Sequence, residues 1–151
     1  ESYDWFTKEA AKRVPKPEDV HAPIWCSISP DNCLKPIEGT VVYILEVPED
    51  KVMYFDDVKW DYVLNRIYLP DDEEDEKAYK QHLKDIGVSN GFEFFQGRYK
   101  GMYPEEEARI RESWKRAFRI DKWTIFNVCG NIWEIRQEWV KRIVKPGEAV
   151  K

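Results

Sequence analysis

Hydrophobic residues recur at helical spacing in two stretches of the first half of the chain. In residues 3–14 they form one broad face opposite lysine, arginine and glutamate, and Pro15 ends the pattern. The same spacing returns in residues 58–68, where Asp56 or Asp57 is the candidate N-cap. Both stretches predict helices with one buried side.

End signals predict two further helices. Six acidic residues at positions 71–76 suit the positive end of a helix dipole, and the helix they begin runs to about Ile86 with Gly87 as its C-cap. Pro104 suits the first turn of a helix through residue 118, which has glutamates at its front and basic residues at its back. A calcium loop would instead need alternating ligands and a glycine at the sharp turn.

Residues 40–47 are mostly apolar on both faces and β-branched at several positions, which predicts a central strand. The pair Cys129-Gly130 interrupts a later apolar segment, and a glycine there predicts a bulge or a close approach of the backbone. Shorter strands are predicted at residues 22–29, 52–55, 123–128 and 131–135, and residues 138–143 form either a strand or a short helix.

Strands and helices interleave, but no glycine-rich loop joins a strand to a helix, so a doubly wound nucleotide fold has no support. We predict one α+β domain over residues 1–145, with a twisted, mainly antiparallel sheet and three to four helices. Residues 146–151 are predicted to be a frayed C-terminal tail.

The charge of the chain disfavours a nucleic-acid partner. The net charge is −5 with a pI near 5.2, whereas binding to phosphates needs a basic face. Basic residues within positions 109–122 offer such a face, but the glutamates at the front of the same helix favour surface charge matched to its dipole. No apolar run approaches the roughly 20 residues that cross a bilayer, so we predict no membrane partner and a cytoplasmic location. The start at Glu1 predicts a piece of a longer protein.

Cysteine and histidine do not predict a metal site. The three cysteines have no zinc spacing, and the chain has only two histidines. Cys26 and Cys33 are interpreted as reduced thiols that pack as small apolar groups, or as a pair that closes a small loop when oxidised.

Seven tryptophans stand out among the 151 residues, four of them beside a polar or charged group in short extended segments. Such rigid, half-polar side chains mark a small anchored core or a recognition surface. The motifs in chain order are Tyr3-Asp-Trp, Pro15-Lys-Pro-Glu18, Pro23-Ile-Trp25, Leu45-Glu-Val-Pro48, Tyr54-Phe-Asp56, Lys59-Trp60, Val63-Leu-Asn65, Tyr68-Leu-Pro70, Ser113-Trp114, Ile132-Trp-Glu-Ile135 and Glu138-Trp-Val140. Over nearly the whole chain this set resembles a bacterial family known as domain of unknown function number 3841. The resemblance implies no activity.

The chain departs from that family in two places. The family usually begins with another strand and a connecting segment before the first helix, and both are absent here. Ahead of Trp133 the family tends to carry a glutamine-alanine pair, where this chain has Cys129-Gly130. If the family has a polar site in that strand, the resemblance implies that this member has lost part of it.

Polar groups embedded in the apolar motifs are the candidate functional residues. Glu134 is the candidate catalytic carboxylate, acting as a general base or a ligand-orienting acid; the alternative is a solvent-facing partner of a neighbouring arginine. Asp56 is interpreted as a helix cap rather than a catalyst. The predicted ligand-binding residues are Trp25, Ser27, Trp60, Asn65, Tyr68 and Trp133, of which Asn65 has a cap or loop hydrogen bond as its alternative role.

Two functions follow from these residues. The first is a binding module in which tryptophan and tyrosine line a cleft for an unidentified small molecule or protein, with no cofactor. The alternative is an enzyme of the ADP-ribosyltransferase type that acts with NAD, suggested by fold-level analogy of the short strands. No nucleophile elbow, Ser-His-Asp order or phosphate loop is present in the sequence.

Overall fold

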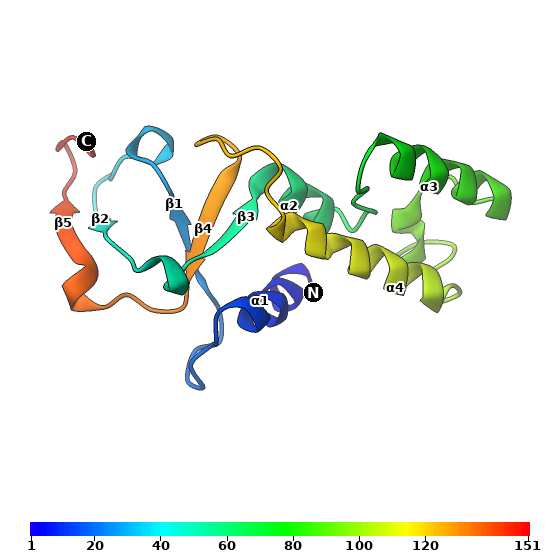
Figure 1. Ribbon diagram of the computed structural model, residues 1–151, viewed down its shortest axis with the longest axis horizontal. Helices are drawn as coiled ribbons and strands as arrows, with labels where there is room; N and C mark the ends of the chain where they lie inside the picture. Colours follow the sequence, from blue (N-terminus) through cyan, green and yellow to red (C-terminus); the bar gives the residue numbers. More distant parts are fainter. The chain divides into compact units, whose positions relative to one another are not determined.

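The computed structural model describes residues 1–151, and the chain groups into two compact units. The sheet unit comprises Tyr3–Phe55 and Ile120–Lys151, with Glu1; the helical unit comprises Asp56–Arg119, with Ser2. Four α-helices and two small antiparallel sheets make an α+β fold, which confirms the predicted class (Figure 1).

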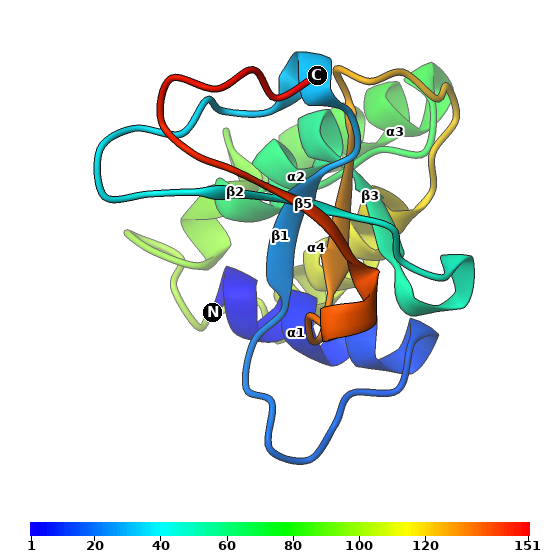
Figure 2. The same cartoon turned by 90° about the vertical axis from the view of Figure 1, so that its left-hand side faces the viewer.

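The sheet unit holds both sheets except for Asp56, the last residue of one strand. Three strands make the first sheet, in the order β1 (Ile24–Ser27), β4 (Val128–Ile132) and β3 (Met53–Asp56). The second sheet has only β2 (Val42–Leu45) and β5 (Val140–Val144). β1 pairs with β4 and β2 pairs with β5, both antiparallel. Within this unit, β2 lies between β5 and β1, and it crosses the direction of β1 (Figures 1 and 2).

The first helix, α1 (Ser2–Arg13), supplies the aromatic core of the sheet unit. Its apolar face buries Phe6 completely, and the Phe6 ring lies 4.7 Å from the Trp25 ring and 5.3 Å from the Phe55 ring. The helix ends one residue before Val14, in front of the first proline, because proline restricts the residues that precede it to extended backbone. This confirms the helix predicted from the spacing.

The helical unit holds three α-helices and a 3₁₀ extension. These are α2 (Asp57–Leu64), α3 (Glu73–Ile86) and α4 (Pro104–Ser113), which continues as a 3₁₀ helix over Trp114–Phe118. Gly87 ends α3 with a φ of 77°, the left-handed conformation that the C-cap prediction requires. No helix of the structure has both the length and the apolar character that a membrane crossing requires.

Trp114 is the centre of the helical unit. It is fully buried, its indole N–H donates to the Ile67 carbonyl at 2.9 Å, and its ring stacks on Phe95 at 5.9 Å. A buried indole needs a partner for its N–H, and the Ile67 carbonyl supplies it. The contact anchors the segment after α2 to the end of α4.

The predicted central strand at residues 40–47 is wrong in its position. Only Val42–Leu45 is strand, and β5 is its one neighbour in the sheet. Val41 and Tyr43 are 44% and 48% exposed. An apolar run on both faces is typical of a strand buried on both sides, but here the strand is half-buried and belongs to a two-stranded sheet.

The predicted division of the late strands is also wrong. Residues 123–127 are not strand: 125–127 form a turn, and Asn127 Oδ1 accepts from the Thr124 N–H at 3.0 Å. The strand β4 runs without interruption through Cys129-Gly130 to Ile132. A Cβ on Gly130 would lie 3.3 Å from Val52 Cγ1. The glycine therefore marks a close approach, one of the two predicted alternatives, and residues 133–135 lie beyond the strand.

The helix predicted over residues 58–68 ends early, at Leu64. Asn65 is its C-cap, and Arg66 follows with a φ of 55°, in the left-handed region that stops a helix. The Ile67 N–H donates back to the Tyr62 carbonyl at 3.0 Å and closes the turn. The prediction was too long because the helical spacing of hydrophobic residues continues to Ile67, beyond the end of the helix.

Asp56→Ala is expected to lower the free energy of unfolding by about 1 kcal/mol. Asp56 Oδ1 accepts from the N–H groups of Val58 at 2.9 Å and Lys59 at 3.2 Å, so the variant leaves two helix donors without their acceptor. Urea denaturation followed by circular dichroism measures the loss. Asp57→Ala removes the adjacent carboxylate, which does not cap, and equal losses in both variants would contradict the capping role.

Candidate functional site

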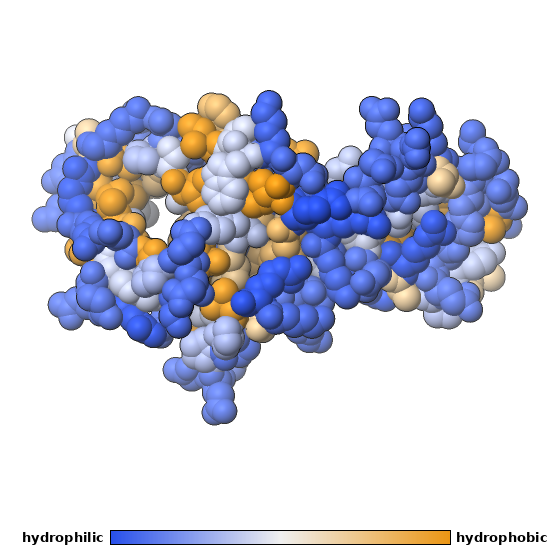
Figure 3. All heavy atoms as spheres, in the orientation of Figure 1, coloured by the Kyte–Doolittle hydropathy of each residue, from blue (hydrophilic) through white to orange (hydrophobic).

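A cleft of about 550 Å³ lies inside the sheet unit. This volume is within the range of ligand-binding pockets in proteins. Figure 3 shows the opening, with hydrophobic residues along its walls. Its lining residues are Ile24, Trp25, Cys26, Ser27, Ile28, Ser29, Pro30, Cys33, Leu34, Val42, Tyr43, Ile44, Leu45, Val47, Val52, Tyr54, Gly130, Ile132, Ile135 and Val150.

None of these 20 lining residues is charged, although charged residues make up 35% of the chain. The hydroxyls of both serines already form hydrogen bonds within the chain. Ser27 Oγ donates to the Asn32 carbonyl at 3.1 Å, and Ser29 Oγ accepts from the Asp31 N–H at 3.2 Å. The walls therefore offer apolar surface and a few engaged hydroxyls, which suits an uncharged occupant.

Two strands meet the cleft along their length. All four residues of β1 and all four residues of β2 line it, whereas no residue of β5 does. Side chains of a strand alternate between its two faces, so a cleft that touches consecutive residues lies along a strand edge. The cleft therefore lies at the edge of β2 that faces away from β5, beside the end strand of the other sheet.

Aromatic side chains form part of the wall. Trp25 is 40% exposed, and its inner side packs against Phe6 and Phe55. Tyr43 is exposed on β2. Tyr54 packs edge-on against Trp123 at 4.9 Å; burial first, and then the neighbouring Glu49 carboxylate, raises the pKa of Tyr54. These ring contacts hold Trp25 and Tyr54 in place.

Two of the three cysteines line the cleft, and both are free thiols. Burial raises the pKa of the Cys26 thiol to about 11, so it stays protonated near neutral pH. A protonated thiol is a weak nucleophile and behaves as a small apolar group. Cys26 therefore adds to the uncharged wall.

Of the predicted ligand-binding residues, the structure brings Trp25 and Ser27 together in the cleft. Trp133, in the same unit, is instead buried, with its indole N–H donating to the Val14 carbonyl at 2.8 Å. The candidate catalyst Glu134 lies on the surface, where its Oε1 accepts from Arg136 Nε at 2.9 Å. Neither Trp133 nor Glu134 lines the cleft.

The other three predicted residues belong to the helical unit. Trp60 is buried on α2, and the Asn65 amide donates to the Asp61 carbonyl at 2.7 Å, one turn back in the same helix. Tyr68 is also buried, and its ring stacks on Tyr79 at 4.0 Å. Tyr68 lines a second, smaller hollow of about 270 Å³ within this unit.

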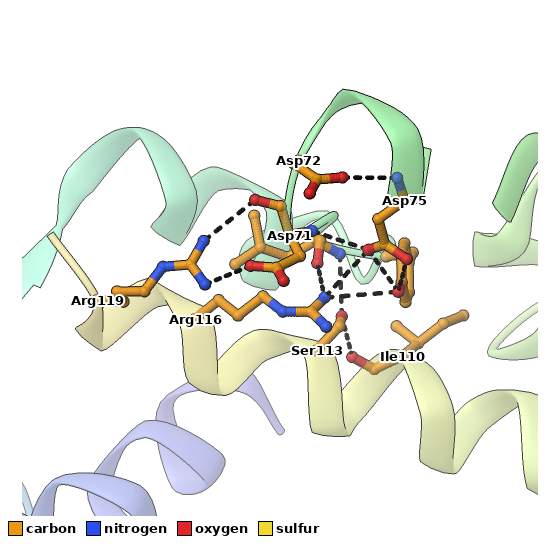
Figure 4. Close-up of polar contacts among 9 residues, drawn as sticks. Asp71, Asp72, Asp75, Ile110, Ser113, Arg116 and Arg119 are labelled. Carbon is orange, nitrogen blue, oxygen red and sulfur yellow. Dashed lines mark hydrogen bonds and ion pairs between the residues drawn. The ribbon is translucent and has the colours of Figure 1, made fainter. Parts of the chain in front are cut away.

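The acidic run forms ion pairs with the 3₁₀ end of α4 (Figure 4). Asp71 pairs with Arg119, and Asp75 lies 3.5 Å from Arg116, which also donates to the Leu69 carbonyl at 2.5 Å. At the start of α3, Asp72 accepts from the Asp75 N–H at 2.8 Å, which confirms the predicted helix start. The carboxylates hold the segment before α3 against the end of α4.

The pKa of Asp75 shows the balance of forces in this network. Burial by itself raises it, but the Asp71 N–H, the Tyr68 hydroxyl, and the charges of Arg116 and Arg109 together lower it below the ordinary value. A lowered pKa in the folded state stabilises the protein above the unfolded-state pKa, and that contribution is lost as the pH falls through the lowered value. The network therefore stabilises the folded protein at neutral pH.

Sequence reasoning missed Tyr43, Ile44 and Tyr54 as cleft residues. The signal for Tyr43 and Ile44 was an uncharged run at positions 41–45 in a chain rich in charge, but such a run is first interpreted as a buried strand. Only the partner strand decides between these interpretations, because β5 covers one edge of β2 and leaves the other to the cleft.

A family model described as Domain of unknown function (DUF3841) matches residues 1–141. The chain belongs to this family. Membership confirms the resemblance seen in the ordered motifs and assigns no activity. No curated protein and no solved structure matches the chain.

Proposed function

We propose that this DUF3841 member is a binding module whose cleft in the sheet unit holds an uncharged, apolar ligand. The observation that carries the proposal is the combination of a cleft of about 550 Å³ with walls that carry no charged residue. Removing apolar surface from water drives such binding at roughly 25 cal/mol per Å² before the costs of association. Tyr43, which is partly exposed on β2 and lines the cleft, is the anchoring aromatic.

The test uses N-phenyl-1-naphthylamine, an uncharged apolar dye whose fluorescence rises when it leaves water. The wild-type protein is expected to raise the fluorescence with saturation. Ile44→Lys places a charge in the cleft wall and is expected to weaken dye binding by about tenfold or more, because an apolar dye cannot compensate the charge.

Ile143→Lys is the matched control, since Ile143 lies on β5 of the same sheet, is exposed, and does not line the cleft. Circular dichroism checks that both variants fold. Unsaturable dye fluorescence in the wild type, or an equal loss in Ile143→Lys, would reject the proposal. The ADP-ribosyltransferase-like alternative stays a prediction, and a thermal shift with millimolar NAD tests it.

A further inference from the structure

We infer that the occupant of the cleft is an extended, uncharged peptide strand that pairs with the free edge of β2. This inference rests on the proposed function and names its ligand class. Peptide addition to a sheet edge takes its affinity from main-chain hydrogen bonds and its specificity from pockets for alternate side chains. The cleft combines both kinds of group in one place.

The first support is the backbone edge. β2 has β5 as its one neighbour in the sheet, and the cleft runs along all four residues of β2 on the side away from β5. A strand at a sheet edge presents a row of N–H and C=O groups to a further strand. A compact apolar molecule offers no matching row of donors and acceptors, whereas an extended peptide does.

The second support is the marginal size of the sheet. Two paired strands are at best weakly stable alone, and a third strand with a hydrophobic face adds substantially to stability. β2 and β5 have four and five residues. A peptide of about four to six residues would match this length and complete a three-stranded sheet.

The third support is charge complementarity. Opposite the β2 edge, the cleft wall presents Ile24, Cys26, Gly130 and Ile132, which the register of β1 and β4 places on one face of their sheet. No lining residue carries a charge to pair with a charged side chain of the peptide. Alternate side chains of the peptide that face this wall are therefore apolar, and those between them are free to be polar.

The test uses a fluorescein-labelled peptide of about six residues in which valine and threonine alternate, measured by fluorescence anisotropy on the whole chain. Two analogues carry N-methyl groups on the valine amides or on the threonine amides. Amides of alternate residues point to the same edge of a strand, so only one edge faces β2. One analogue is expected to lose about tenfold or more in affinity while the other retains it.

Ile44→Lys is expected to lose the peptide and Ile143→Lys to keep it. Equal affinities of the three peptides would overturn the inference, and so would binding of the apolar dye without competition from the peptide. The latter result leaves the proposed function standing, whereas failure of both probes removes the two together. A dimer that forms without peptide and disappears in Ile44→Lys would assign the edge to a second copy of the chain and also overturn the inference.

Discussion

Trp133→Ala is expected to lower the free energy of unfolding by about 3–5 kcal/mol. Trp133 is 6% exposed, and its indole N–H donates to the Val14 carbonyl at 2.8 Å, across 119 positions of the chain. The variant leaves a cavity in the sheet unit and removes the donor from a buried carbonyl at the end of α1. Chemical denaturation followed by far-ultraviolet circular dichroism measures the effect.

Trp123→Ala is the matched control, because Trp123 belongs to the same unit but is 55% exposed. Its loss is expected to stay below about 1 kcal/mol. A similar loss in the two variants would contradict the assignment of Trp133 to the core. Trp133→Phe separates the two contributions in large part, since it removes the donor and keeps most of the buried volume.

Gly91→Ala is expected to destabilise the helical unit by about 1–3 kcal/mol. A Cβ at this position would lie 2.4 Å from Tyr79 Oη and 3.4 Å from Ile110 Cδ1. The Tyr79 ring cannot easily move away, because it is buried and stacked on Tyr68. The hydroxyl and the new methyl group therefore compete for the same space.

Tyr79→Phe is expected to rescue most of this loss. Tyr79 Oη is buried and has no hydrogen-bond partner, and burial, followed by the Glu106 carboxylate, raises the pKa of Tyr79. Removing an unpartnered buried hydroxyl costs little and relieves its desolvation. The double variant Gly91→Ala/Tyr79→Phe should therefore show a coupling of about 1–2 kcal/mol in a double-mutant cycle.

Gly97→Ala provides the control for this cycle. Gly97 has a φ of 82° with open space around it, so alanine there costs backbone strain and creates no clash with Tyr79. Tyr79→Phe should leave the cost of Gly97→Ala unchanged. Equal rescue of both alanine variants would show that Tyr79 acts on stability in general and not on the space beside Gly91.

Local signals predicted the helices well because they act within a few residues. The first proline after α1, the Asp56 cap and the left-handed Gly87 all lie next to the helix ends that they set. The end of α2 was missed because the turn depends on the left-handed conformation of Arg66. Arginine rarely adopts this conformation, so its presence in a sequence does not predict a helix end.

The strands and the cleft depend on partners far along the chain. Whether β2 is central or at an edge is decided by its pairing with β5, about 100 positions later, so the hydrophobic run alone favoured the wrong answer. Trp25 and Ser27 were found because their short strand is bounded by prolines and mixes polar with apolar groups. Trp133 shares the same sequence character, but its partner is the end of α1, and only the fold reveals that.

The absence of charged side chains from the cleft wall determines the ligand selectivity that the cleft would have. A wall without charged side chains forms no ion pair with a ligand. A ligand that carries an ionised group would lose its hydration on binding without compensation, so the cleft would select by excluding charged ligands. Selectivity of this kind admits a range of related sequences. The protein would then bind peptides of different sequence, provided that each contains an uncharged extended segment.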